Sequence, residues 1–398
     1  MESRTVGTVV RGIRTPIIKE GDNLTKIVVD SLLRASCGEK FEFNDRDVVA
    51  ITEAVVGISD GNYVTVDEIA SDIKKKFPSG EMAIVFPSPM SRNRFAILLK
   101  AMARACHKLV IALTYPSDEV GNKLFNEELL EKYDINPYSR LLEEDEYMRY
   151  FGDEVHIFTG INYVKYYKEL VENEDCEVNF IFTNKAEDVL KYCKDCLVAN
   201  IHDRHKTKKA LKEAGATTVY GTDEVLTESV NGSGYNSKYG LLGSNKSTEE
   251  KVKLFPENGQ KLVEEIQKEL KDKTGKNIEV MIYGDGAFKD PVGGIWELAD
   301  PVVSPAYTKG LEGTPNELKL KFLSDNKFAD LKGDELIDAM RKEIKNKDSN
   351  LKGTMATQGT TPRRYTDLLG SLADLTSGSG DKGTPVVLIQ NYFTNYAD

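Results

Sequence analysis

The chain has 398 residues, of which 40% are hydrophobic and 29% charged, and its formal net charge is −11 at pH 7. This composition is typical of globular proteins and excludes a fibrous or disordered chain, while the length favours at least two lobes. Because a nucleic-acid backbone requires a concentrated basic face, the acidic balance argues against general nucleic-acid binding. Five cysteines without a disulfide framework, no apolar signal segment and no long apolar run predict a cytoplasmic protein with no membrane anchor.

Strand and helix patterns alternate along the first third of the chain. An amphipathic helix is predicted from residue 24 to 33, with Asn23 as its N-cap. Buried strands are predicted over 47–56, 82–86 and 109–113, and helices over 64–75 and 91–106. This alternation predicts a mostly parallel sheet with helices on its faces.

The middle third begins with an acidic helical stretch and continues with a second strand–helix series. Strands are predicted over 154–158, 178–182, 196–201 and 217–219, with helices between them. The series lacks a Gly-x-Gly-x-x-Gly turn, so it predicts a Rossmann-like lobe without the usual means of binding a dinucleotide. Cys193-x-x-Cys196 and His202-x-x-His205 do not have the spacing of a common zinc finger, which favours buried thiols over a zinc site.

The last third opens with a Gly/Ser/Asn-rich stretch over 231–245 that interrupts the regular pattern and is typical of a functional loop. Helices are predicted over 260–274, 334–345 and 366–376, and strands over 278–283 and 385–390. The chain is therefore expected to have an α/β fold, with mixed sheets and flanking helices.

A Gly-Asp-Gly turn follows the predicted strand over 278–283. Glycines there allow a ligand to approach the backbone, and the strand end brings a carboxylate to the edge of the sheet. Asp285 and Asp290 carry hard oxygen ligands suited to Mg²⁺ or Mn²⁺, and Lys289 offers a point charge for a phosphate. The alternative is an ordinary Gly/Asp-rich turn.

A second candidate segment runs from Asp367, at the start of a predicted helix, into a Gly/Ser-rich loop before the last strand. Such a loop resembles an anion nest, although it is not a Walker A motif. A flexible polar hairpin loop is the alternative. The loop consists of Ser377, Gly378, Ser379, Gly380, Asp381, Lys382, Gly383 and Thr384.

Two further segments carry candidate phosphate or substrate ligands. Arg92 and Arg94 stand in the first turn of a predicted helix, where cations oppose the helix dipole unless an anion binds there. Solvated arginines are the alternative. Asp118 and Glu119 follow a strand end, where they could bind a metal or an amine, or form a turn with a helix N-cap.

Taken together, these segments resemble the coenzyme F420-0:γ-glutamyl ligase family, which adds glutamate to a deazaflavin cofactor using GTP. The segments over 14–24, 47–52 and 240–245 look like the opening, the first buried strand and a conserved turn of that family. The strand before Asp285, the position of Asp367 and the loop over 377–384 also look like family motifs. The resemblance covers roughly 1–65 and 235–398.

The resemblance implies a ligase that uses Mg²⁺ or Mn²⁺ and GTP or ATP to join L-glutamate, or another amino acid, to a carboxylate of a small-molecule acceptor through an acyl phosphate. Asp285 and Asp367 would be metal ligands, with Asp290 as a further one, and Lys289 would act beside them. Contacts with the nucleotide would come from the loop over 377–384 and from Thr15, Pro16, Ile17, Ile18, Thr52 and Asn245. It also implies a homodimer and a two-part core, residues 1–125 and 236–398, with an inserted Rossmann-like lobe over 126–235.

Two family positions differ in this sequence. Leu242 replaces an aspartate that ligates metal in the family, and Ile58 replaces a lysine on the family's Ser-Lys-Ala-Glu-Gly loop. Arg92 or Arg94 could supply the missing positive charge. These replacements leave open another metal-dependent phosphoryl-transfer reaction, or a non-catalytic protein that binds a nucleotide or metabolite.

Overall fold

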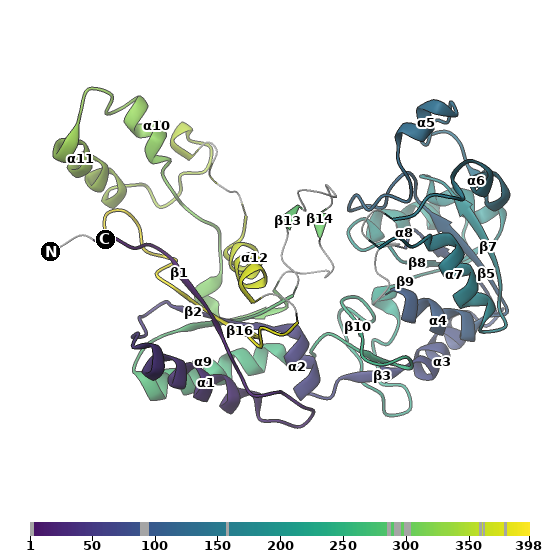
Figure 1. Cartoon of the computed structure of the whole chain (residues 1–398), viewed down its shortest axis with the longest axis horizontal. Helices are drawn as coiled ribbons and strands as arrows, with labels where there is room; N and C mark the ends of the chain where they lie inside the picture. Colours follow the sequence, from purple (N-terminus) through teal and green to yellow (C-terminus); the bar gives the residue numbers. More distant parts are fainter. Residues whose placement is uncertain are drawn as a thin grey trace.

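The structure is a computed structural model of the whole chain, and it shows two lobes side by side, each built on its own β-sheet (Figure 1). It describes residues 4–87, 95–156, 159–284, 304–357, 360, 363–377 and 380–398, and the backbone of 288–289 and 296–297. We call the lobe that contains both ends of the described chain the core lobe, and the other the second lobe.

The core lobe is built on a five-stranded mixed sheet in the order β1-β16-β2-β12-β15. β2 and β12 are parallel, and every other neighbouring pair is antiparallel. The strands are β1 (Val9–Ile13), β2 (Val48–Thr52), β12 (Glu279–Tyr283), β15 (Ala306–Tyr307) and β16 (Val386–Gln390). β2, β12 and β16 are almost continuously buried, because helices cover both faces of the sheet.

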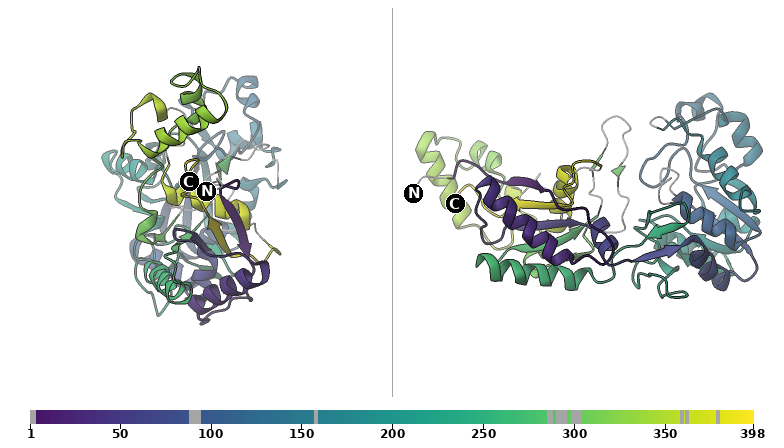
Figure 2. Two further views of the ribbon diagram at one scale, coloured as in Figure 1. Left: turned by 90° about the vertical axis from the view of Figure 1, so that its left-hand side faces the viewer. Right: turned by 60° about the horizontal axis from the view of Figure 1, so that its bottom comes forward.

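Two long helices, α1 (Leu24–Glu39) and α9 (Gly259–Thr274), lie next to each other on one face of the core sheet (Figures 1 and 2). The side chain of Asn23 accepts a hydrogen bond from the backbone N–H of Lys26, which confirms it as the N-cap of α1. A third helix, α12 (Tyr365–Ser377), covers the opposite face. The core sheet is thus the middle of three layers.

The second lobe contains a six-stranded sheet in the order β6-β7-β5-β4-β8-β9, in which only the edge strand β6 is antiparallel. Its strands are β4 (Glu81–Val85), β5 (Lys108–Leu113), β6 (Leu142–Glu143), β7 (Glu177–Phe182), β8 (Asp195–Val198) and β9 (Thr218–Gly221). The first parallel strand, β4, lies in the centre and the chain winds outward from it in both directions. This is the doubly wound order of Rossmann-like folds.

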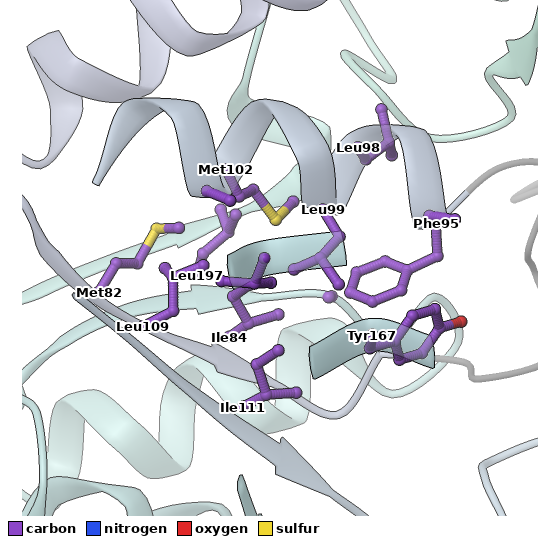
Figure 3. Packing of buried hydrophobic residues seen from close by; sticks show 14 of the residues in the cluster. Met82, Ile84, Phe95, Leu98, Leu99, Met102, Leu109, Ile111, Tyr167 and Leu197 are labelled. Atoms are coloured by element: carbon purple, nitrogen blue, oxygen red, sulfur yellow. The ribbon is translucent and has the colours of Figure 1, made fainter. Parts of the chain in front are cut away.

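Helices α3 (Val66–Lys76), α4 (Phe95–Ala105) and α7 (Tyr163–Glu172) pack on one face of this sheet, and α8 (Arg204–Glu213) packs on the other. Figure 3 shows Leu99 and Met102 of α4 against the sheet residues Ile84 and Ile111. All four side chains are fully buried. The second lobe therefore has a hydrophobic core of its own.

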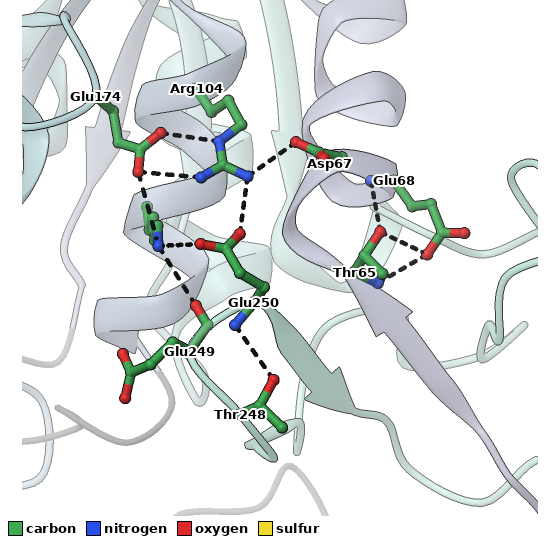
Figure 4. Close-up of polar contacts among 9 residues, drawn as sticks. Thr65, Asp67, Glu68, Arg104, Glu174, Thr248, Glu249 and Glu250 are labelled. Carbon is green, nitrogen blue, oxygen red and sulfur yellow. Dashed lines mark hydrogen bonds and ion pairs between the residues drawn. The ribbon is translucent and has the colours of Figure 1, made fainter.

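A small antiparallel sheet, β10-β11-β3, lies between the two larger ones. Its strands are β3 (Tyr63–Thr65), β10 (Asn245–Lys246) and β11 (Lys251–Lys253). Val64 and Val252 are part of the hydrophobic cluster of the second lobe. Arg104 of α4 binds Glu250 at the tip of the β10–β11 hairpin, so the hairpin is attached to the second lobe (Figure 4).

The remaining elements connect these layers or lie at their margins. They are α2 (Glu53–Ser59), α5 (Glu128–Lys132), α6 (Glu144–Phe151), η1 (Ala186–Lys191), η2 (Thr222–Glu224), β13 (Phe288–Lys289), β14 (Trp296–Glu297), η3 (Lys309–Leu311), α10 (Leu320–Asp325), α11 (Gly333–Lys345) and η4 (Met355–Thr357). Across the described residues, none of the helices has the length and apolarity needed to cross a membrane.

The predicted α/β fold with flanking helices is confirmed, and three details differ. The strand predicted over 47–56 ends at Thr52, and α2 begins at the next residue, Glu53. Residues 154–156 are not in a strand, and 157–158 lie outside the described residues. The predicted lobe boundary at residue 125 is wrong, because β4 and β5 form the centre of the second lobe's sheet. The apolar runs identified these strands correctly but carried no information about which sheet they join.

Candidate functional site

Four strand ends of the core sheet meet at one edge, which we call the ligand edge. Thr52 pairs with Tyr283 in the parallel register, so β2 and β12 end together. Val386 pairs with both Ile13 and Ile51, so β16 begins and β1 ends at the same edge. In α/β proteins, ligands bind in loops at the carboxyl ends of parallel strands.

Backbone hydrogen bonds bring several predicted nucleotide contacts together at this edge. The N–H of Thr15 donates to the carbonyl of Gly383 at 3.3 Å, and the N–H of Thr52 donates to that of Pro385 at 3.0 Å. The hydroxyl of Thr384 donates to the carbonyl of Ser377 at 2.8 Å. The turn that begins at Thr15 therefore lies against the Gly-rich loop, as the sequence predicts for two parts of one site.

The rest of both segments is open to solvent. Ile17 is 84% exposed, while Ile18 packs against the core. In the Gly-rich loop, Asp381 and Lys382 are exposed, and Gly378 and Ser379 lie outside the described residues. An exposed lysine beside a glycine-rich backbone is compatible with a phosphate ligand.

A buried group of charged and polar side chains lies directly beyond the end of β2. Glu53, the first residue of α2, is 5% exposed, and the ammonium of Lys253 from β11 lies 3.9 Å from its Oε1. The Nδ2 of Asn245, which pairs with Lys253 across the β10–β11 hairpin, lies 3.4 Å from the same oxygen. Asn245 and Thr52 were both predicted to contact the nucleotide. Glu53 links them, because it follows Thr52 in the chain and its carboxylate lies beside Asn245.

Glu53 and Lys253 were both missed from the sequence. The signal was present in Lys253, because it interrupts the buried apolar run Val252-Lys253-Leu254-Phe255, where a charged residue requires a partner. Glu53 was hidden because it was assigned to a strand that in fact ends one residue earlier.

One of the two family positions that differ in this sequence, Leu242, is packed against the protein itself. Leu242 is buried, at 5% exposure. The next residue, Gly243, has φ +73°, and a Cβ placed on it would lie 2.1 Å from Cε2 of Phe255. A turn packed this tightly presents an apolar side chain to the interior where a metal ligand was expected.

Asp367 lies toward the end of α12 that is away from the ligand edge. Tyr365, the first residue of α12, packs on Phe393 with ring centroids 5.1 Å apart, and Phe393 follows the far end of β16. Ser377, the last residue of α12, contacts Thr384 at the ligand edge. Asp367 is therefore ten residues before the ligand-edge end of α12, about 15 Å along the helix axis. Asp367 and the Gly-rich loop are near each other in the sequence. They are apart in space because α12 runs away from the loop.

The other predicted metal and phosphate ligands lie outside the described residues. They are Asp285, Asp290, Arg92, Arg94 and the side chain of Lys289. Among the side chains that the structure does describe, no group of three or more His, Cys, Asp or Glu is arranged to hold a metal ion. The metal site therefore stays a prediction.

Asp118 and Glu119 belong to the second lobe, and both accept structural hydrogen bonds, Asp118 within its own turn and Glu119 from a distant helix start. The carboxylate of Glu119 accepts hydrogen bonds from the backbone N–H groups of His202 at 3.0 Å and Asp203 at 3.2 Å, at the start of α8. Asp118 accepts bonds from the backbone and side chain of Asn122 at 2.8 and 2.6 Å. These contacts match the turn and helix cap that the sequence offered as the alternative.

The cysteine and histidine pairs that suggested zinc are not arranged as a metal site. Cys196 lies in the buried strand β8, and burial raises the pKa of its thiol to about 12. Its Sγ faces the carbonyl of Cys193 at 4.0 Å. His202 and His205 are exposed beyond the other end of that strand.

A comparison with protein-family models matches residues 12–391, nearly the whole chain, to F420-0:gamma-glutamyl ligase. The chain therefore belongs to the F420-0:gamma-glutamyl ligase family, as its motifs indicated, and it is a ligase-type enzyme with small-molecule substrates such as glutamate. A search of curated proteins finds no match.

Proposed function

We propose that this protein is a nucleotide- and metal-dependent amide ligase that joins glutamate, or another amino acid, to a carboxylate of a small-molecule acceptor. The observation that carries the proposal is the ligand edge. Thr15, Thr52 and Thr384 meet there, beside the buried group formed by Glu53, Lys253 and Asn245.

The nucleotide is proposed to bind along this edge. The exposed turn from Thr15 to Ile18 and the loop over 380–384 would contact it with their backbone groups, and Lys382 would approach the phosphates. GTP and ATP are both candidates, because nothing in these contacts selects a base.

A divalent metal would be held at the same edge. Glu53 and Asn245 offer hard oxygen atoms there, and Asp285 follows β12 in the sequence by two residues. This donor set fits Mg²⁺ or Mn²⁺, which commonly take one or two carboxylates and complete their shell with phosphate oxygens and water. When bound, the metal would neutralise charge on the phosphates.

The proposed reaction has two steps. The acceptor carboxylate attacks the terminal phosphorus of the nucleotide, which forms an acyl phosphate and releases the nucleoside diphosphate. The amine of glutamate then attacks the acyl carbon, loses a proton, and releases inorganic phosphate. The protein's part is to align these groups and to stabilise the charge that develops, which is how most such enzymes lower the barrier.

Phosphate release tests the proposal. Purified protein with Mn²⁺ and either GTP or ATP should release phosphate only when both glutamate and a carboxylate acceptor are present. A deazaflavin acceptor and folate-like pterins would be screened first. Release that ignores glutamate would identify a different phosphoryl-transfer enzyme instead.

A non-catalytic protein that binds a nucleotide or metabolite is the second candidate, favoured by the buried Leu242 at the family's metal position. It predicts nucleotide binding without phosphate release under any combination of acceptor and amino acid. The two proposals are separated by measuring binding and turnover on the same sample.

We also propose that the protein works in the cytoplasm as a homodimer. Five cysteines without a disulfide among them support the first part, and the family resemblance supports the second. Size-exclusion chromatography with light scattering tests the dimer.

A further inference from the structure

We infer that a second copy of this chain docks along the exposed side of α1, so that the two α1 helices lie antiparallel across a twofold axis. The inference rests on the homodimer proposed above, and it adds the surface through which the dimer forms. Three features support it: a long groove beside α1, the order of charges along that groove, and its position next to the ligand edge.

A groove of about 790 Å³ follows α1 on the outside of the core lobe, where the helix faces the viewer in the right-hand view of Figure 2. Its lining extends from Pro16 and Asn23, ahead of the helix, to Cys37 in the last turn. Because a helix rises about 1.5 Å per residue, the part from Asn23 to Cys37 is about 20 Å long. Ile27 and Leu33, both half-buried, add apolar surface to the lining. A small molecule would fill only part of this length, whereas a second helix matches it.

The side of α1 that faces α9 is less suited to a second copy. The cavity there is smaller, at about 460 Å³, and its lining is polar or charged throughout. Three of the lining residues are acidic, Glu265, Glu269 and Asp272, against one lysine, Lys268. Two copies brought together on that side would place acidic residues near one another, which disfavours association.

Charged residues of alternating sign recur at every fourth position along the α1 groove. They are Asp22, Lys26, Asp30 and Arg34, and all four side chains are exposed. When a second α1 is laid antiparallel, with the twofold axis between Lys26 and Asp30, Lys26 faces Asp30 of the partner subunit. Asp22 then faces Arg34 of the partner subunit. A parallel copy in the same register would place every charge opposite its own kind, so the pattern fits an antiparallel second copy.

The charges and the apolar residues of the groove would have different roles. Lys26 and Asp30 already form an ion pair within one helix, at 2.6 Å, but their side chains are 67% and 52% exposed. Such a pair contributes little by itself, because water and salt screen it. A partner would bring a second opposite charge to each residue and so fix the register, while burial of Ile27 and Leu33 would supply affinity.

Pro16 connects the groove to the ligand edge. It follows Thr15, whose backbone N–H donates to the carbonyl of Gly383 at 3.3 Å. A partner subunit in the groove would therefore lie beside the turn that is proposed to contact the nucleotide.

Charge reversal followed by sedimentation velocity of the full-length protein, over a range of concentrations, tests the inference. Lys26→Glu would place a carboxylate opposite Asp30 of the partner subunit, and Asp30→Lys would place an ammonium opposite Lys26 of the partner subunit. Because the twofold axis repeats each contact, we expect either variant to raise the dimer Kd by about tenfold or more. A mixture of the two variants should form mixed dimers with a Kd within about threefold of the unmodified protein, because all facing charges again have opposite signs. Only folded chains can give this recovery.

Lys209→Glu and Glu213→Lys are the matched controls. Lys209 and Glu213 of α8 are also four residues apart, with charged atoms at 3.7 Å and side-chain exposures of 75% and 68%. These substitutions change the net charge and an exposed helical ion pair in the same way, but in the second lobe and away from the groove. They should leave the dimer Kd unchanged, both alone and mixed.

The possible results are distinct. If the unmodified protein is a dimer and either α1 variant dimerises equally well, the inference is wrong and the homodimer proposal stands. If the mixture stays as weak as the single variants, the two positions do not face each other and the inference is likewise wrong. If the unmodified protein is a monomer at every concentration, the homodimer proposal fails and the inference fails with it. Phosphate release tests the proposed reaction separately from all three.

Discussion

Replacing Arg104 with methionine should loosen the β10–β11 hairpin from the second lobe. The guanidinium of Arg104 forms two bonds with Glu174, at 2.8 and 3.1 Å, and one bond each with Asp67 at 2.8 Å and Glu250 at 2.9 Å (Figure 4). These partners come from the end of α7, from α3 and from the hairpin. A methionine keeps the apolar stem and removes only the charge and its hydrogen bonds.

The expected loss of stability is about 2 kcal/mol. The two-bond contact with Glu174 is partly buried, with side-chain exposures of 26% and 15%, and contributes the larger part, about 1.5 kcal/mol. Asp67 and Glu250 are 79% and 54% exposed, so each adds only a few tenths of a kcal/mol. Lys100 remains 3.8 Å from Glu174 in the variant, so that carboxylate still has a cation beside it.

Urea unfolding and amide hydrogen exchange would measure this loss. The variant should unfold at a lower urea concentration. Exchange should accelerate most around Glu174, less over residues 245–253, where Lys100 still binds Glu250, and least in α1 of the core lobe. Lys261→Met is the matched control, because Lys261 is 78% exposed and makes only a 3.7 Å contact with Glu265. If the two variants unfold alike, or if 1 M salt enlarges their difference, the ionic account of the hairpin is wrong.

Three other predictions concern single positions. Gly243→Ala should cost about 2–5 kcal/mol in a thermal or urea melt, because the new methyl group needs both a positive φ and the space that the ring of Phe255 occupies. Burial lowers the pKa of His156 in the folded protein, so as the pH falls the unfolded chain binds a proton at this residue before the folded protein does. The free energy of unfolding should therefore decrease as the pH drops below about 6.5. Urea melts at successive pH values should show a flatter pH profile in this range for His156→Gln. A thiol reagent should modify the exposed Cys37 rapidly and the buried Cys106 slowly, because burial raises the pKa of Cys106 to about 12. Mass spectrometry of digested peptides would measure the order of modification. Modification at Cys106 before Cys37 would contradict this prediction.

Local patterns in the sequence were sufficient to predict most of the elements. The helix after Asn23 and the buried strand before Gln390 depend on neighbouring residues only, and both are present. The assignment of β4 and β5 to a lobe failed, because strand pairing joins residues far apart in the chain: Ile84 pairs with Leu197. No hydrophobic period encodes such a partner.

The candidate site shows the same division between local and distant information. Thr52, Asn245 and Thr384 were named from motifs, and the structure places all three at or beside the ligand edge. The distance of Asp367 from the ligand-edge end of α12 could not be predicted, because a motif gives a position along the chain and not the direction of the helix that carries it. Lys253 was overlooked because the residue it pairs with, Glu53, lies 200 residues earlier in the chain.

The position of the hairpin shows how the two lobes could share one site. Asn245 and Lys253 are carried by strands attached to the second lobe, whereas Glu53 begins the helix that follows β2 of the core lobe. The contacts of Glu53 with these two residues therefore cross from one lobe to the other. Arg104→Met removes one of the contacts that hold this hairpin, and with it Asn245, beside Glu53. That variant is therefore expected to weaken triphosphate binding slightly as well as to lower stability.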